Sequence, residues 1–365
     1  AASPAPKRVQ IVDDTTPADK AYKLACEGTG LLWMGDFQNA RHLLQALTRR
    51  LDKKGVPAKR GADTPDQGAH SAGQAFHRHR QNQAHRARIL GMLLIPFNAD
   101  HCIPLRRAPD VRQACSEAYG AATEAYVTSL RELLGLIGAH EWRKKGVAIE
   151  ALKGHGSGRI HAHYGVFSPV RGEYVDLVKQ APLPAGTGHA VDVGTGSGVL
   201  AAVLASRGIQ QITATDQDER ALACAKENLH RLKLAPHVNV VQADLFPPGQ
   251  ASLIVCNPPW LPARPSSPIE YAVYDPDSRM LRGFLSGLKA HLKPQGEGWL
   301  IMSDLAEHLG LRAPDELQGW IREAGLRVVG KLDARPRHPK AQDASDPLHR
   351  ARAAEVTSLW RLAAI

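Results

Sequence analysis

The sequence predicts an α/β protein whose C-terminal half folds as a mostly parallel, seven-stranded sheet with helices on both faces. Three observations support this prediction. From about Val175, short apolar runs typical of strands alternate with longer runs of helical periodicity, the pattern of a parallel sheet covered on both faces. A glycine-rich turn, Gly194 to Gly198, follows the first apolar run. Acidic residues, Asp216 and Asp244, stand at the ends of the next two.

This alternation gives the approximate bounds of each element. Strands are expected near 188–193, 211–216, 238–242, 252–256, 298–303, 326–332 and 355–362. Helices are expected near 197–207, 218–232, 278–292 and 314–324. Asp218 stands where the second of these helices opens and is predicted to cap it. Because a direct return between the last two strands makes them antiparallel, we expect the last strand to be antiparallel to the others.

The N-terminal part of the chain shows a different pattern. Residues 1–20 are rich in Ala, Pro, Lys and Asp and are expected to form a mobile tail. Residues 21–145 carry apolar side chains at helical spacing and are expected to form a mainly helical domain. Its helices are expected near 36–51, 76–95, 110–119 and 122–141. Residues 146–175 are expected to form a linking β-hairpin with a glycine-rich turn, which leaves 176–365 for the sheet domain.

A dense basic stretch lies in the N-terminal domain at residues 76–88, where His and Arg recur on an expected helix. The whole chain has a formal net charge of +10, and basic proteins are biased towards polyanionic partners. Two interpretations stay open: a solvated helix face, and a surface that contacts RNA phosphates. Residues 54–74, before this stretch, have no periodicity and are expected to be a loop or disordered insert.

Several classes of protein are excluded by composition. No run of about 18 apolar residues occurs, so neither a transmembrane helix nor a membrane partner is expected. The first 20 residues lack the apolar core of a signal peptide. The five cysteines are scattered without a C-x-x-C pair, so we expect neither a disulfide framework nor a bound metal. This cysteine usage fits the reducing cytoplasm.

The glycine-rich turn predicts a site for a phosphate-like or nucleoside ligand. Glycines let a backbone approach a ligand closely, and the helix that follows favours negative charge at its N-terminus. Asp216 can accept hydrogen bonds from both hydroxyls of a ribose, and Asp244 from an adenine amino group whose ring Leu245 covers. The spacing G-x-G-x-G differs from the dinucleotide fingerprint G-x-G-x-x-G. NAD remains an alternative ligand, but it does not explain the end of the fourth strand.

The fourth strand is followed by Asn257-Pro258-Pro259-Trp260. Two prolines stiffen this loop and remove two backbone donors, which leaves the Asn257 side-chain oxygen and the Pro258 carbonyl as fixed acceptors. Both can accept hydrogens from one NH2 group and so aim its delocalised lone pair at an electrophile. Trp260 can stack on the flat group that carries the nitrogen. The alternative interpretation is a rigid turn that ends a buried strand.

Together these residues resemble the class I S-adenosylmethionine-dependent methyltransferases, over about residues 147–365, and within them the N-methylating branch with an Asn-Pro-Pro-aromatic motif. The resemblance implies a Rossmann-like seven-stranded sheet with the last strand antiparallel, S-adenosyl-L-methionine as cofactor, and enzymatic methyl transfer to nitrogen. The implied cofactor-binding residues are Asp192, Gly194, Thr195, Gly196, Gly198, Asp216, Asp244, Leu245 and Asn257. The implied residues for the target nitrogen are Asn257, Pro258, Pro259 and Trp260.

A closer resemblance is to the HemK-type protein glutamine methyltransferases, which also have a helical N-terminal domain joined to the core by a β-hairpin. Residues 167–178 look like a degenerate form of the segment before their first core strand, whereas Trp260 replaces their usual tyrosine. The resemblance implies a substrate-recognition role for 21–145 and a glutamine amide of a translation-machinery protein as substrate. RNA methyltransferases use similar loops, so an adenine-N6 or guanine-N2 atom of rRNA or tRNA is the alternative. A non-catalytic cofactor-binding module is a further alternative.

Overall fold

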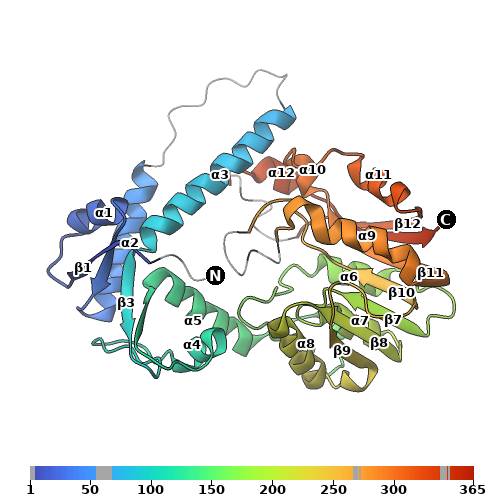
Figure 1. Ribbon diagram of the computed structural model, residues 1–365, viewed down its shortest axis with the longest axis horizontal. Helices are drawn as coiled ribbons and strands as arrows, with labels where there is room; N and C mark the ends of the chain where they lie inside the picture. Colours follow the sequence, from blue (N-terminus) through green and yellow to red (C-terminus); the bar gives the residue numbers. More distant parts are fainter. Residues whose placement is uncertain (1–4, 55–67, 266–269, 271–272, 338–342, 344–345) are drawn as a thin grey trace. The chain divides into compact units, whose positions relative to one another are not determined.

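The computed structural model describes residues 5–54, 68–265, 270, 273–337, 343 and 346–365 (Figure 1). The chain divides into two compact units. The first comprises Ala1–Gln67 and His77–Glu141, and the second comprises Gly68–Phe76 and Trp142–Ile365. Most of the predicted insert at 54–74 lies outside the described residues, but its last part, from Gly68, is helical.

The N-terminal unit contains a four-stranded sheet of order β1-β2-β3-β4. Its strands are β1 (Arg8–Val12), β2 (Thr29–Trp33), β3 (Leu93–Phe97) and β4 (Tyr126–Ser129). The first three are parallel, and β4 is antiparallel to β3. The helices are α1 (Ala18–Cys26), α2 (Phe37–Lys54), α3 (Gly68–Leu90), α4 (Arg112–Tyr119) and α5 (Leu130–Lys145), of which α3 and α5 have residues in both units.

This sheet was not expected in a domain predicted to be mainly helical, although α2, α3, α4 and α5 lie near the four predicted helices. Strand β1 lies inside the predicted mobile tail, and α1 begins within that tail at Ala18. Residues 93–97 form β3 instead of continuing α3, and 126–129 form β4 instead of the first turn of a long helix. Apolar runs of four or five residues fit both helical and strand periodicity, and pairing with neighbouring strands decides between them.

The second unit contains a seven-stranded sheet of order β12-β13-β11-β10-β7-β8-β9 (Figure 1). Its strands are β7 (His189–Val193), β8 (Gln211–Asp216), β9 (Val238–Gln242), β10 (Ala251–Cys256), β11 (Leu292–Ser303), β12 (Leu326–Ala334) and β13 (Thr357–Ala364). The last strand, β13, is antiparallel to its neighbours β11 and β12, and the other pairs are parallel. The predicted Rossmann-like fold, with its antiparallel last strand, is confirmed.

Helices cover both faces of this sheet: α6 (Glu173–Gln180), α7 (Val199–Ser206), α8 (Glu219–Arg231), α9 (Arg279–His291) and α11 (Glu316–Glu323). Two further helices, α10 (Leu305–His308) and α12 (His349–Ala354), pack together in a separate cluster, and the 3₁₀ turns are η1 (Glu150–Leu152), η2 (Ala235–His237) and η4 (Pro276–Ser278). Successive strand residues pack into different cores, as the pleat requires. Leu253 packs with α6 and α7, whereas Ile254 packs with α9 and α11. Burial on both faces explains why these strands are continuously apolar.

A short hairpin precedes the sheet, formed by β5 (Val147–Ala148) and β6 (Arg159–Ile160). It ends at Ile160 and is therefore smaller than the predicted linker 146–175, and α6 begins within that range at Glu173. Beyond β6, His163 Nε2 lies 2.6 Å from a carboxylate oxygen of Glu227 on α8. The described residues contain no group of three or more His, Cys, Asp or Glu placed to hold a metal ion. In the same part of the chain, none of the helices is long and apolar enough to cross a membrane.

Candidate functional site

The predicted site residues lie in or beside the loops that follow four neighbouring strands, β10, β7, β8 and β9. These strands are parallel, so their carboxyl ends lie at the same edge of the sheet. Ligands of open α/β sheets bind at this edge. The loop after β10 adjoins the glycine loop after β7, because these two strands pair directly.

The glycine loop requires glycine at three alternate positions. Gly194, Gly196 and Gly198 have φ angles of 70°, 53° and 80°, a region that side chains rarely adopt. A Cβ on Gly194 would lie 2.4 Å from Met280 Cε, and one on Gly198 would lie 3.1 Å from Ala225 Cα. A Cβ on Gly196 would meet no atom within 4 Å. The two ends of the loop are therefore packed, while its central glycine faces open space that a ligand can approach.

Asp192 supports this loop from the end of β7. Its side chain is buried, and Oδ2 accepts hydrogen bonds from Thr195 Oγ1 at 2.6 Å and from the Ala201 N–H at 3.0 Å. Burial raises the pKa of this carboxyl to about 6, although both hydrogen bonds act in the opposite direction. The contacts of Asp192 thus fix the turn between β7 and α7.

Asp192→Asn is expected to flatten the pH dependence of folding stability. Because the folded pKa, about 6, lies above the ordinary value of 3.8, the stabilising protonated form is fully present below pH 3.8. That contribution, on the order of 3 kcal/mol, is lost as the pH rises through about 6. Asparagine can accept both hydrogen bonds through Oδ1 and cannot ionise. Urea unfolding between about pH 4 and about pH 8 measures the difference, and equal pH slopes for the two proteins would contradict the expectation.

Asp216 connects the glycine loop to the next strand. Its Oδ2 accepts from the Gly196 N–H at 3.0 Å, and its Oδ1 accepts from the Asp218 N–H at 3.0 Å. Burial raises the pKa of its carboxyl. Because a carboxylate offers about four acceptor sites, it can still accept from a ribose hydroxyl. Asp218 accepts from the Arg220 N–H at 3.0 Å and caps α8, as the sequence predicts.

The loop after β9 carries Asp244, which has two hydrogen-bond partners that no sequence pattern indicated. Asp244 accepts from Gln217 Nε2 at 2.7 Å and from Arg279 Nη2 at 3.0 Å. Leu245 has a φ of 70°, and its carbonyl accepts from Thr215 Oγ1 at 2.6 Å. The start of α9 therefore contributes Arg279 to the same edge as the predicted residues. Its separation from Asp244 by 35 positions gives no periodic signal in the sequence.

The loop after β10 is fixed by a hydrogen bond inside the motif. Trp260 Nε1 donates to Asn257 Oδ1 at 2.9 Å, and the Trp260 side chain packs partly against the cores on both sheet faces. The indole therefore holds the amide oxygen that is predicted to accept from a target NH2. Because an amide oxygen has two lone pairs, one remains for such a donor. The stacking role of Trp260 remains a prediction.

Asp275 ties this loop to the start of α9. Its N–H donates to the Leu261 carbonyl at 2.9 Å, and its carboxylate accepts from the N–H groups of Met280 at 3.0 Å and Leu281 at 3.1 Å. Burial raises the pKa of this carboxyl. One acid thus fixes both the chain after Trp260 and the helix whose Met280 side chain covers Gly194.

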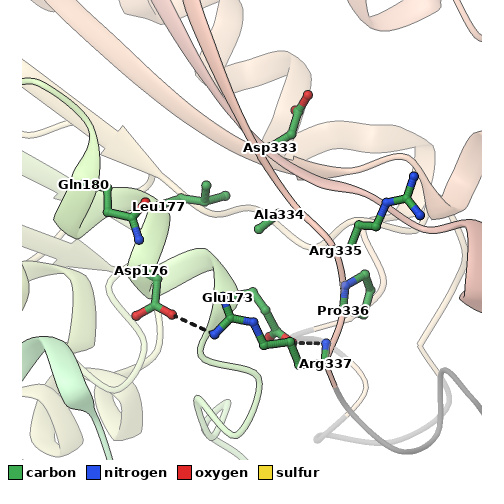
Figure 2. Close-up of a pocket in the computed structure, with 9 residues that line it drawn as sticks. All are labelled: Glu173, Asp176, Leu177, Gln180, Asp333, Ala334, Arg335, Pro336 and Arg337. Carbon is green, nitrogen blue, oxygen red and sulfur yellow. Dashed lines mark hydrogen bonds and ion pairs between the residues drawn. The ribbon is translucent and has the colours of Figure 1, made fainter.

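A separate cavity of about 400 Å³ lies between α6 and the end of β12 (Figure 2). It is lined by Glu173, Asp176, Leu177, Gln180, Asp333, Ala334, Arg335, Pro336 and Arg337. Arg337 closes one side, where its N–H donates to Glu173 Oε1 and its guanidinium lies 3.9 Å from Asp176 (Figure 2). None of the predicted site residues lines this cavity.

The residues at the carboxyl edge fit a nucleoside cofactor in three respects. Space is open at Gly196, unused acceptor capacity remains on Asp216, and Leu245 presents an apolar side chain beside Asp244. The fit is weakest at Asp244, because Gln217 and Arg279 already donate to its two oxygens. An adenine amino group would have to share that carboxylate.

Comparison with known proteins relates this edge to methyltransferases. A family profile described as "Methyltransferase small domain" matches residues 157–310, which include the glycine loop and the Asn257 loop. The release factor glutamine methyltransferase of Rhodopirellula baltica is 37% identical over 94 residues, which are 24% of this chain and 32% of that protein. The ribosomal protein L11 methyltransferase of Leuconostoc citreum is 48% identical over 56 residues, 15% of this chain and 19% of that protein.

A third relative is matched over more of its length. The tRNA1(Val) (adenine(37)-N6)-methyltransferase of Bacteroides thetaiotaomicron is 30% identical over 160 residues, which are 42% of this chain and 67% of that protein. The chain spans only 32% and 19% of the lengths of the first two relatives. The three relatives are named for three different acceptors, so they agree on the transferred group and differ on its destination.

Proposed function

The chain belongs to the class I S-adenosylmethionine-dependent methyltransferases, and we propose that it transfers a methyl group to a planar NH2 group on a macromolecule of the translation machinery. One observation carries the proposal. Asn257 and its two prolines follow β10, the strand that pairs with β7 and its glycine loop. A nitrogen held at Asn257 would thus lie beside a cofactor held at the glycine loop.

The cofactor would be held by the residues of the first three loops. Asp216 would accept from the ribose hydroxyls, and the backbone around Gly196 would allow close approach. Asp244 and Leu245 would face the adenine, and Asp192 would keep the glycine loop in shape. When bound, S-adenosylmethionine supplies an electrophilic methyl group on a positively charged sulfur.

The acceptor nitrogen would be positioned by the fourth loop. Asn257 Oδ1 and the Pro258 carbonyl would each accept one N–H of the target, which directs the nitrogen lone pair towards the methyl group. These hydrogen bonds strengthen as positive charge develops on nitrogen, so they stabilise the transition state more than the bound substrate. The nitrogen becomes acidic as it gains the methyl group, and its proton can then leave without a strong base.

Two acceptors fit this loop, and different observations favour them. A protein glutamine amide is favoured by the HemK-type pattern at residues 167–178 and by the similarity to a release factor glutamine methyltransferase. An RNA adenine or guanine amine is favoured by the net charge of +10 and by the longer match to a tRNA adenine methyltransferase. The four-stranded sheet in the N-terminal unit also departs from the helical domain that the HemK resemblance implies.

The test is product analysis with the full chain. Purified protein is incubated with radiolabelled S-adenosylmethionine and with ribosomes, release factors or total tRNA, and each product is treated with ribonuclease or protease. Label released by protease as N5-methylglutamine supports the first acceptor, and label in N6-methyladenine or N2-methylguanine supports the second. Label recovered only on carbon or oxygen would overturn the planar-nitrogen proposal, as would a protein that binds the cofactor and labels none of these macromolecules.

We further propose that the basic stretch 76–88 of α3 contributes to RNA binding if RNA is the substrate. Replacing Arg78, Arg80, Arg86 and Arg88 with Gln should then flatten the dependence of tRNA affinity on salt, by roughly 0.7–0.9 in logarithmic slope for each lost phosphate contact. Two of these arginines have contacts in the structure, Arg86 with Asp52 and Arg88 with His85.

Arg112→Gln is a matched control for this experiment, since it removes an exposed arginine of the same unit that is paired with Asp110. The measurement is a titration of total tRNA at several salt concentrations. An unaltered slope in the fourfold variant would assign residues 76–88 to a solvated helix face and would favour a protein substrate.

A further inference from the structure

A buried arginine, Arg312, contacts the loop 257–260, which we call the acceptor loop. Arg312 stands between α10 and α11, and its side chain is only 2% exposed. Its Nη2 donates to the Trp260 carbonyl at 3.2 Å, and its Nη1 donates to Glu307 Oε1 at 3.4 Å. Its guanidinium carbon also lies 5.9 Å from the centre of the Trp320 ring.

Folding stability alone does not explain this arginine. Burying a guanidinium is costly, and an apolar side chain of similar volume often serves a core as well or better. The compensation here is incomplete, because Arg312 Nε and Glu307 Oε2 are buried without a hydrogen-bond partner among the described residues. The ion pair itself is long, at 3.4 Å. We therefore explain the burial of Arg312 by its hydrogen bond to the Trp260 carbonyl and not by a contribution to folding stability.

Trp260, to which Arg312 donates, is hydrogen-bonded in turn to the side-chain amide of Asn257. Arg312 fixes the backbone of Trp260, and the indole of Trp260 donates to Asn257 Oδ1 at 2.9 Å. The residue after Trp260, Leu261, packs with Ala306 of α10, next to Glu307. The backbone and the side chain of Trp260 are thus both fixed, one by Arg312 and the other by Asn257.

This connection determines which atom Asn257 offers to a substrate. A side-chain amide can rotate and exchange its oxygen for its NH2 group. A rotated Asn257 would place its NH2 donors against the indole N–H, so the indole selects the orientation with Oδ1 beside it. An oxygen held in this orientation can accept from a target NH2, whereas the NH2 of Asn257 cannot.

We propose that Arg312 is a positioning residue for methyl transfer, which acts through Trp260 to hold the Asn257 amide in its accepting orientation. The inference rests on the proposed function, because it assigns Arg312 a role in presenting the target nitrogen. Among the described residues, Arg312 donates to Glu307 and to Trp260 and lies beside the ring of Trp320, so cofactor affinity should not depend on it.

The first test observes the indole directly and needs no activity. Nitrogen-15 labelling gives a separate NMR signal for the indole of each of the six tryptophans, and Trp260→Phe identifies the signal of Trp260. Arg312→Met should shift this signal and speed its exchange with solvent. Arg312→Lys can still donate to the Trp260 carbonyl and should produce a smaller shift.

Arg207→Met is the matched control. Arg207 also donates to backbone carbonyls, those of Val178 and Ala181, each at 2.6 Å, and its guanidinium carbon lies 5.6 Å from the centre of the Trp299 ring. Its loss should move the signal of Trp299 and leave that of Trp260 unchanged. An unmoved Trp260 signal in both Arg312 variants would overturn the inference, and Arg312→Lys alone decides this point if Arg312→Met does not fold.

The second test measures transfer. Arg312→Met should lower kcat per folded molecule by roughly 10- to 100-fold, the scale for a slightly misplaced reacting group, while cofactor Kd stays unchanged. Arg312→Lys should recover part of this loss, and Arg207→Met should keep the wild-type kcat. A normal kcat in Arg312→Met would overturn the positioning role. If instead the proposed function is wrong, the wild-type protein itself will transfer no methyl group to nitrogen, so the two failures can be told apart.

Discussion

Asn257→Ala is expected to slow methyl transfer by roughly 10²–10³-fold, the usual effect of removing one positioned transition-state hydrogen bond. Asn257 follows Cys256 at the end of β10, and its oxygen already accepts from the Trp260 indole. The variant loses the acceptor for one N–H of the target and leaves the Pro258 carbonyl to hold the other. Cofactor affinity should fall far less than the transfer rate, because most of the residues proposed to contact the cofactor belong to the neighbouring loops.

Two further variants separate the contributions at this loop. Asn257→Asp should be milder, since a carboxylate still accepts from the indole and from the target. Trp260→Phe keeps an aromatic ring for stacking but removes the N–H, whereas Trp260→Ala removes both and should raise KM as well as lower kcat. Single-turnover transfer is measured beside calorimetric cofactor affinity for each variant. Near-normal transfer by Asn257→Ala would show that the planar-nitrogen mechanism is wrong and would turn attention to oxygen or carbon acceptors.

The catalytic sheet was predictable because each of its strands carries several independent signals. Strands such as β7 and β10 are apolar on both faces, have Gly or Pro at their ends, and are spaced for a helix crossing or a short loop. These features agree on one arrangement, and such agreement makes a sequence specify a fold. The glycine turn follows β7, and Asp216 ends β8. Because the carboxyl ends of parallel strands lie at the same edge of a sheet, the sequence also predicted that these residues would lie close together.

The N-terminal sheet was not predictable by the same means. Strand β3 directly follows the long helix α3, and its five residues continue the apolar character of the helix end. Strand β1 lies among Ala, Pro, Lys and Asp residues that are typical of tails. What stabilises β1 is its parallel pairing with β2, a contact between distant segments. The composition of residues 8–12 alone cannot predict a pairing with residues 29–33.

The supporting contacts of the site were hidden for a related reason. Arg279 reaches Asp244 across 35 positions, and Arg312 reaches Trp260 across 52. Neither separation has a period that a helix or strand pattern would reveal. The side chains proposed to contact ligands lie at or after the ends of strands and could be found from the sequence. Those that position them, Arg279 at the start of α9 and Arg312 between α10 and α11, come from distant segments and require the structure.

Asp216→Ala is expected to weaken cofactor binding by about 1–3 kcal/mol, which corresponds to roughly 5- to 150-fold in Kd. The variant loses the proposed acceptor for the ribose hydroxyls. It also releases the N–H groups of Gly196 and Asp218, which the carboxylate holds at 3.0 Å each, so the glycine loop loses one of its anchors. The measurement is calorimetric titration with S-adenosylmethionine and with S-adenosylhomocysteine.

Asp244→Ala is the matched control for this variant, since it removes an acid from the next loop along the same edge. Asp244 is half exposed and already paired with Arg279 and Gln217, so its loss should weaken binding less than the loss of Asp216, which is half-buried and holds the Gly196 N–H. Thermal unfolding of both variants without cofactor shows whether each protein remains folded. If Asp216→Ala bound both ligands as tightly as the wild-type protein, the ribose would have to lie elsewhere, and the cofactor placement along β7, β8 and β9 would be wrong.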